Sequence, residues 1–122
     1  MSANDSKNDS VLFDPHTRRL DAIQIAQDMN VPIDTVAGAI GVNTLVVRQH
    51  PDSNRLQAQL LPVYRVWAAI VELHAGNKKN ARIFISAPNK HLENRAPIEF
   101  IERGDLKPLE GLAESMSARE PA

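Results

Sequence analysis

A stripe of apolar residues between positions 54 and 75 limits what this chain can fold into more than any other feature. Five large side chains recur at alternating spacings of four and three residues: Leu56, Leu60, Val63, Trp67 and Ile70. This periodicity places them on one face of an α-helix. Pro62 lies inside the run, where a proline removes one helical hydrogen bond and kinks or divides the helix. We therefore predict a helix over residues 54–75 that ends at Gly76 and buries Trp67 in a core.

Prolines, glycines and asparagines divide the rest of the chain into short helical segments. We find no internal repeat and no convincing pair of strands. Helices are predicted over residues 17–29, on both sides of Gly41-Val42, up to about Ile85, and over 97–103 and 106–117. Pro97 suits the first position of a helix and Gly104 suits the residue after its end. The predicted fold class is all-α, with an N-terminal helix-turn-helix-like bundle and a small C-terminal helical domain.

The first of these helices is predicted to begin at Thr17 or Arg18, with Thr17 as its cap. Leu20, Ile23 and Gln27 are predicted to lie on one face of this helix, with Ala26 beside them.

The chain is predicted to contain three regions. Residues 1–16 include a run rich in Ser, Asn and Asp that cannot bury enough apolar surface, so we expect a disordered tail. Residues 17–53 form the helix-turn-helix-like region, and residues 54–122 form a helical binding domain with a frayed end. A chain of 122 residues with 43% hydrophobic residues suits one domain, or two small helical units that share a core.

The sequence lacks the residues or motifs that several classes of catalytic, metal and nucleotide-binding site require. The absence of cysteine excludes disulfides and thiolate ligands or nucleophiles. The four histidines have no metal-ligand spacing, and no phosphate-loop, dinucleotide or serine-nucleophile motif occurs. We therefore expect a binding protein with no cofactor or metal rather than an enzyme. The notable apolar run at 66–71 is far shorter than the roughly 20 residues of a membrane span, so we expect a soluble, cytoplasmic protein with no membrane partner.

Residues 33–50 show the steric signature of a helix-turn-helix unit. That unit needs a small residue in its first helix, a left-handed glycine in its turn, and apolar residues that pack inward. Ala37, Gly41-Val42 and Val47 supply these features in order, and Asn43 suits the N-terminal cap of the second helix.

In DNA recognition the outward residues of the second helix contact the major groove. The candidate DNA-binding residues are Thr44, Arg48, Gln49 and Arg55. Arg48 suits guanine or phosphate, and Gln49 suits adenine. The same helix also carries Leu45 and Val46, where a groove-facing helix usually has polar residues. A helix pair that packs without binding DNA therefore remains an alternative to a DNA-binding helix-turn-helix. The net charge of -1 does not distinguish the two interpretations.

The C-terminal third is polarised in charge. Residues 77–95 have a net charge of +4, and residues 96–122 have a net charge of -3. Both parts are interleaved with apolar residues, which are too numerous for a solvated tail. This block should therefore pack on the helix that contains Trp67 or meet a partner.

An ordered set of residues follows within this block: Phe84, Ser86-Ala87-Pro88-Asn89, Leu92-Glu93, Arg95, Pro97, Gly104, Leu109, Leu112 and Met116. The set resembles the C-terminal toxin-binding domain of Xre/MbcA/ParS antitoxins, most closely the MbcA type over the stretch PNKHLENRAP. The resemblance covers about residues 56–117, and the layout upstream of it also agrees. The sequence departs from the family at Phe84, where many members have Trp, and at residues 94–97, where many read Gly-Arg-Thr-Pro.

This resemblance implies an antitoxin of a type II toxin–antitoxin system whose partner is a RES-domain toxin that degrades NAD. Such antitoxins cover the active-site entrance of the toxin, and many repress their own operon as dimers. We accordingly expect a homodimer or a larger toxin–antitoxin hetero-oligomer, with operator DNA as a second partner.

By position, Asn89, Leu92 and Arg95 match the core of the family motif, and with Pro97 they are expected mainly to shape its turn. Contacts with the toxin are expected more from the last helix and tail, at Glu110, Glu114, Met116 and Arg119. Two other interpretations stay open. One is a helix-turn-helix transcriptional regulator without a toxin partner, and the other is a helical scaffold whose tail docks on an unrelated protein.

Overall fold

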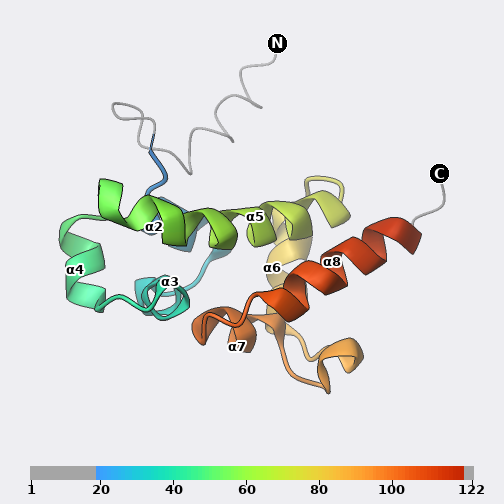
Figure 1. Ribbon diagram of the computed structural model, residues 1–122. Coiled ribbons are helices and arrows are strands. Elements are labelled where there is room, and N and C mark those ends of the chain that lie inside the picture. The colour runs from blue at the N-terminus through green and yellow to red at the C-terminus, as the bar shows by residue number, and fades with distance from the viewer. Residues whose placement is uncertain (1–18, 120–122) are drawn as a thin grey trace, which may run out of the picture.

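The computed structural model describes residues 19–119, with side chains described as far as Met116. The predicted disordered tail at 1–16 and the last three residues lie outside this range. The regular elements of the described part are helices (Figure 1), which confirms the all-α class. The elements are α2 (Ala22–Met29), α3 (Ile33–Ile40), α4 (Thr44–Gln49), α5 (Gln57–Leu73), α6 (Lys78–Ser86), α7 (Pro97–Glu102) and α8 (Lys107–Arg119), with 3₁₀ turns at Asn54–Leu56 and Lys90–Leu92.

Helix α5 is the long central element, and α2, α3, α6 and α8 pack against it (Figure 1). All five residues of the predicted stripe are buried, and Trp67 is only 1% exposed. The helix continues through Pro62, so of the two predicted effects of this proline, a kink or a division, the division does not occur. It is also shorter than predicted, because its first turn is the 3₁₀ turn at Asn54–Leu56 and it ends at Leu73.

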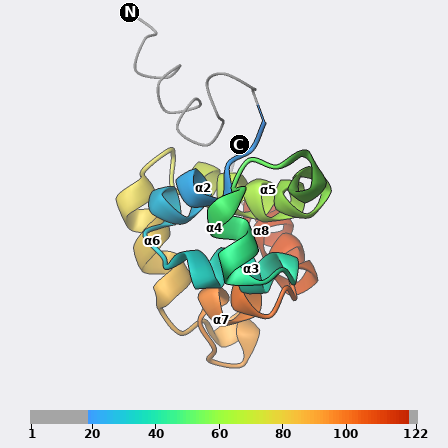
Figure 2. The same ribbon diagram turned by 90° about the vertical axis from the view of Figure 1, so that its left-hand side faces the viewer.

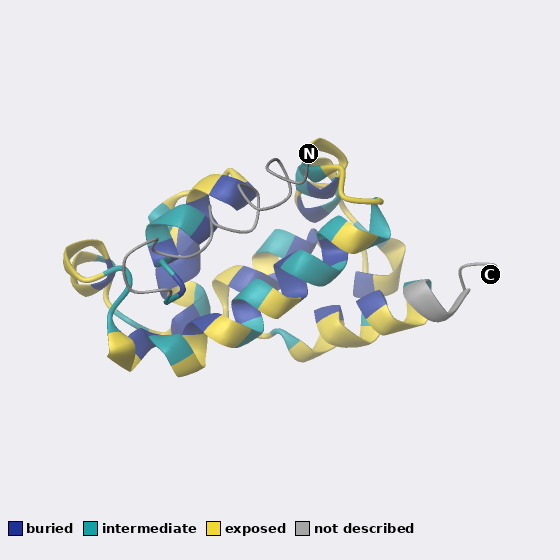
Figure 3. Ribbon diagram, turned by 90° about the horizontal axis from the view of Figure 1, so that it is seen from above, coloured by how far each residue is buried: buried dark blue, intermediate teal, exposed yellow. Residues whose placement is uncertain are grey.

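The core is one cluster of buried side chains that extends from Leu20 to Leu109. It includes residues of α2 and α3 as well as residues of α5, α6 and α7. The helix-turn-helix-like region and the C-terminal region therefore share a core. Figure 3 shows the buried residues along α5 and its neighbours, while α4 at one end is mostly exposed.

Helix α2 begins later than the sequence indicated. Its cap is Asp21, whose Oδ1 accepts hydrogen bonds from the amides of Ile23 and Gln24 at 2.9 and 3.0 Å. A carboxylate that satisfies two otherwise unpaired amides starts the helix here. The predicted start at Thr17 or Arg18 is therefore wrong for this helix, and both residues lie outside the described range.

The face that the sequence groups on this helix is only partly buried. Leu20 and Ala26 are buried. Ile23 is half-buried and Gln27 is exposed. The buried positions of this helix are Ala22, Ile25, Ala26, Asp28 and Met29.

The buried carboxylate of Asp28 joins three helices. One of its oxygens accepts a hydrogen bond from the indole Nε1 of Trp67 at 2.6 Å, and the other pairs with Lys78 Nζ at 2.9 Å. Arg82 Nε donates to the main-chain carbonyl of Asp28 at 2.8 Å. The carbonyls at the end of a helix lack helical partners and form the negative end of its dipole. Two cations of α6 therefore lie where the end of α2 favours positive charge.

Helices α3 and α7 make the other long-range contact that organises the chain. A side chain at Gly38 would overlap the carbonyl oxygen of Glu102. At Gly104 a Cβ would lie 2.9 Å from the carbonyl oxygen of Ala39, and the backbone φ of 74° is left-handed. The amides of Gly104 and Asp105 donate to the carbonyls of Ile101 and Phe100, at 2.9 Å each, and this closes the end of α7. The predicted role of Gly104 is confirmed.

We expect Asp28→Ala to lower the free energy of unfolding by about 3 kcal/mol, because it leaves the Trp67 indole and Lys78 without their acceptor. Asp28→Asn keeps an oxygen for the indole but loses the ion pair, so it should lose less. Urea unfolding followed by far-UV circular dichroism measures both changes. An alanine variant as stable as the wild type would contradict a stabilising role of this cluster.

We expect Gly38→Ala to lower the free energy of unfolding by about 1–3 kcal/mol, because the methyl group must push α7 away from α3. Gly111→Ala is the matched control, since nothing lies within 4 Å of that Cβ position on α8. The control should be stabilised by about 0.5–1 kcal/mol through better helix propensity. Thermal unfolding of the two variants should shift in opposite directions, and equal shifts would refute the close contact.

Candidate functional site

Helices α3 and α4 are joined by the three residues 41–43. Gly41 has a left-handed φ of 68°, and the amide of Val42 donates to the carbonyl of Ala37 at 3.1 Å. Asn43 caps α4 by accepting from the amide of Leu45 at 2.8 Å. Ala37 and Val47 are both buried. The local features expected of a helix-turn-helix unit are present, and its action on DNA stays a prediction.

The DNA-binding candidates lie on and just after α4. Arg48, Gln49 and Arg55 are exposed, while Thr44 is half-buried in the first turn of α4. Figures 1 and 2 place α4 at one end of the molecule. Leu45 and Val46 are also exposed, at 61% and 46%. This end of the molecule therefore presents polar and apolar side chains together.

The turn between α6 and α7 is held mainly by Asn89. Its side-chain Oδ1 accepts from the amide of His91 at 2.8 Å, and its own amide donates to the carbonyl of Arg95 at 3.1 Å. Its carbonyl accepts from the amide of Asn94 at 2.9 Å. Glu93 and Asn94 both adopt left-handed backbone angles, with φ of 58° and 65°. The turn is thus a closed loop stabilised by its own hydrogen bonds.

The residues predicted to shape this turn occupy structural positions. Leu92 is 6% exposed, and Pro97 begins α7 and is buried. The carboxylate of Glu99 accepts from the amide of Ala96 at 3.1 Å, which supports the start of α7. Of the four residues predicted to shape the turn, Arg95 is the exposed one and is therefore available to a partner.

The positive charge of residues 77–95 is partly used inside the molecule. Lys78 and Arg82 are bound to Asp28, whereas Lys79, Lys90 and Arg95 are exposed. Sequence reasoning missed this link. The only signal was an aspartate in the last turn of a predicted helix, where the helix dipole disfavours a negative charge unless a cation lies nearby.

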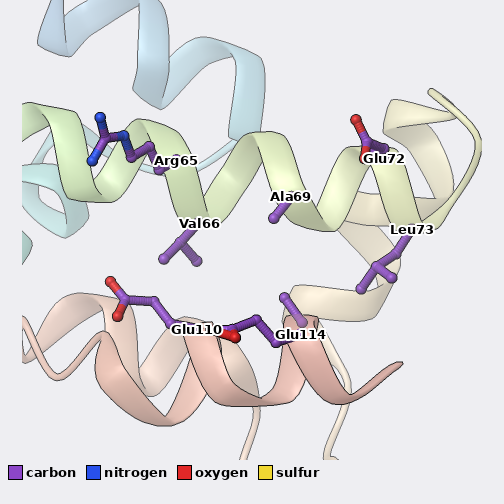
Figure 4. Close-up of a pocket in the computed structure, with 8 residues that line it drawn as sticks. Arg65, Val66, Ala69, Glu72, Leu73, Glu110 and Glu114 are labelled. Carbon is purple, nitrogen blue, oxygen red and sulfur yellow. The ribbon is translucent and has the colours of Figure 1, made fainter. Parts of the chain in front are cut away.

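A groove of about 540 Å³ lies between α5 and α8 (Figure 4). Its lining consists of Arg65, Val66, Ala69, Glu72, Leu73, Glu110, Ala113 and Glu114. In Figure 4, Val66 and Leu73 point from α5 toward α8, whereas Arg65 and Glu72 point away from α8. Glu110 and Glu114 lie on the side of α8 that faces α5.

The predicted toxin-binding residues therefore fall into two places. Glu110 and Glu114 line the groove, and Met116 follows half-buried on the same helix. Arg119 is the last residue of α8, and its side chain is outside the described part. The segment between α6 and α7 lies below α8 in Figure 1, on the side away from α5, whereas the groove is lined by residues of α5 and α8. The structure does not bring the two sets together.

Comparison with known proteins found no matching family model, no matching curated protein and no matching solved structure. Among the described helices none has the length and apolar content needed to cross a membrane. In the same part of the chain, no group of three or more potential ligands is placed to hold a metal ion.

Proposed function

We propose that this protein is a cytoplasmic antitoxin of a type II toxin–antitoxin system, which binds a RES-domain toxin and blocks its NAD-degrading active site. The proposal rests on the resemblance of the C-terminal block to Xre/MbcA/ParS antitoxins. One structural observation supports it most. Asn89, Leu92 and Pro97 are committed to shaping a turn, while Arg95 and the acidic residues of α8 remain exposed for a partner.

Inhibition of this kind is a matter of binding alone. An antitoxin surface that occupies the entrance of the toxin active site keeps the substrate out and needs no chemistry of its own. Stable protein interfaces bury roughly 1,200–2,000 Å² in total. The exposed sides of α8 and of the 87–96 turn, with Arg95, Glu110 and Glu114, are the surfaces we assign to this contact.

Expression of the product of the adjacent open reading frame alone should stop growth and deplete NAD. Co-expression with this chain should restore both and yield a complex that co-purifies, because this chain would bind the other protein and occlude its active site. Growth curves, NAD assays and size-exclusion chromatography measure these results. A neighbour that is harmless alone, or that does not co-purify, would exclude the antitoxin role for this pair.

We further propose that α4 represses the operon by binding operator DNA as part of a dimer. The exposure of Arg48 and Gln49 at one end of the molecule supports this role. Two half-sites in one dimer add their binding energies, which suits a reading helix with few cations. The alternative is a transcriptional regulator that uses the same surface and has no toxin partner.

Arg48→Ala should weaken binding to the promoter fragment by about 1–3 kcal/mol, because it removes a base or phosphate contact. Lys79→Ala removes the same charge from an exposed position on α6 and should leave binding unchanged. Fluorescence anisotropy at several salt concentrations tests both variants, since phosphate contacts produce a negative salt slope. Absence of wild-type binding at low salt would rule out autorepression.

A further inference from the structure

The α5–α8 groove combines an apolar floor with acidic edges. Val66, Ala69 and Leu73 of α5 and Ala113 of α8 supply the apolar part, and Ala69 and Leu73 are only half-buried. Half-buried apolar side chains in a concave surface gain stability when a partner covers them. The groove volume of about 540 Å³ falls within the range of roughly 300–1,000 Å³ typical of ligand sites. It accommodates several side chains of a partner.

The charge around this floor is mainly negative. Glu72, Glu110 and Glu114 line the groove, and only Arg65 opposes them. Within the described part of the chain, none of these three carboxylates has an ion-pair or hydrogen-bond partner. Glu72 also lies in the last turn of α5, at the negative end of the helix dipole. The local field therefore favours a positively charged occupant.

The charge and geometry of the groove exclude several kinds of ligand. Nucleic acid and anionic lipid are repelled by the carboxylates. The three carboxylates do not gather around one point in a way that would hold a metal ion. Glu110 and Glu114 are separated by one turn of α8, about 6 Å along its axis. Lysine or arginine side chains four residues apart on a facing helix would match this spacing.

We propose that the α5–α8 groove docks an amphipathic helix of a protein partner, with apolar side chains on the floor and lysine or arginine beside Glu110 and Glu114. This is the helix-in-groove mode of recognition, in which apolar anchors provide affinity and charges provide orientation. Only the identity of the partner as the toxin rests on the proposed function. The chemistry of the groove is independent of it.

The first experiment uses a synthetic helical peptide of about 18 residues, long enough to fold when bound. Its apolar face carries leucine and alanine, and lysine and arginine flank that face. The control peptide has glutamate at every cationic position. Titration into the full chain, followed by calorimetry and by amide NMR shifts, should show binding of the cationic peptide alone. The shifts should be confined to α5 and α8, and binding should weaken with added salt.

Variants of the chain locate the site. Glu114→Lys should weaken binding of the cationic peptide at least about tenfold, since it replaces an attraction with a repulsion. Glu102→Lys is the matched control, because it makes the same charge change at an exposed residue of α7 that does not line the groove. Ala69→Phe, which fills the floor, should also reduce binding. Far-UV circular dichroism of each variant verifies that the helices are retained.

Three outcomes would overturn the proposal: no binding of the cationic peptide, equal binding by both peptides, or equal loss of affinity in Glu114→Lys and Glu102→Lys. The same two variants, tested against the product of the adjacent gene, separate the two proposals. If that product binds the wild type and Glu114→Lys equally well, the toxin is excluded as the occupant of the groove and the antitoxin role stands. If it does not bind at all while the peptide occupies the groove, the antitoxin role fails and the groove stands.

Discussion

The buried carboxylate of Asp28 is the interaction on which the rest of this structure depends. Its two oxygens are shared between the Trp67 indole on α5 and the ammonium group of Lys78 on α6. A buried carboxylate is tolerated only when its acceptor sites are filled, so α2, α5 and α6 must meet at this point. No buried side-chain nitrogen or oxygen in the described part is left without a partner. The position of α6 then determines where the turn and α7 begin.

The second constraint is the close contact between α3 and α7. Gly38 and Gly104 let α7 approach the backbone of α3 more closely than any side chain would permit. With the Asp28 cluster on one side and this contact on the other, the C-terminal block is packed firmly on the N-terminal helices. The two surfaces proposed to bind partners, α4 and the α5–α8 groove, are built on helices that contribute to this single core.

The sequence predicted helix caps and helix starts that depend on neighbouring residues. It did not predict how the helices pack against one another. Asn43 caps α4, and Pro97 begins α7 as expected. The predicted start of α2 was wrong, because Thr17 and Asp21 are both good caps and the structure uses Asp21. Of the candidate site residues, Glu110 and Glu114 share a face of α8 through their spacing of four, but the sequence did not predict that they line a groove with α5.

The sequence by itself determined the all-α class, the central helix and most helix ends, because each depends on residues within about one helical turn of one another. Only the tertiary structure decided which charged residues are used inside the molecule. Asp28 is 39 residues from Trp67 and 50 from Lys78 in the chain. It also decided that Val66 and Glu114 line one groove. Contacts between distant residues depend on how helices cross, and a helical period does not decide which of the preferred crossing angles a pair of helices adopts.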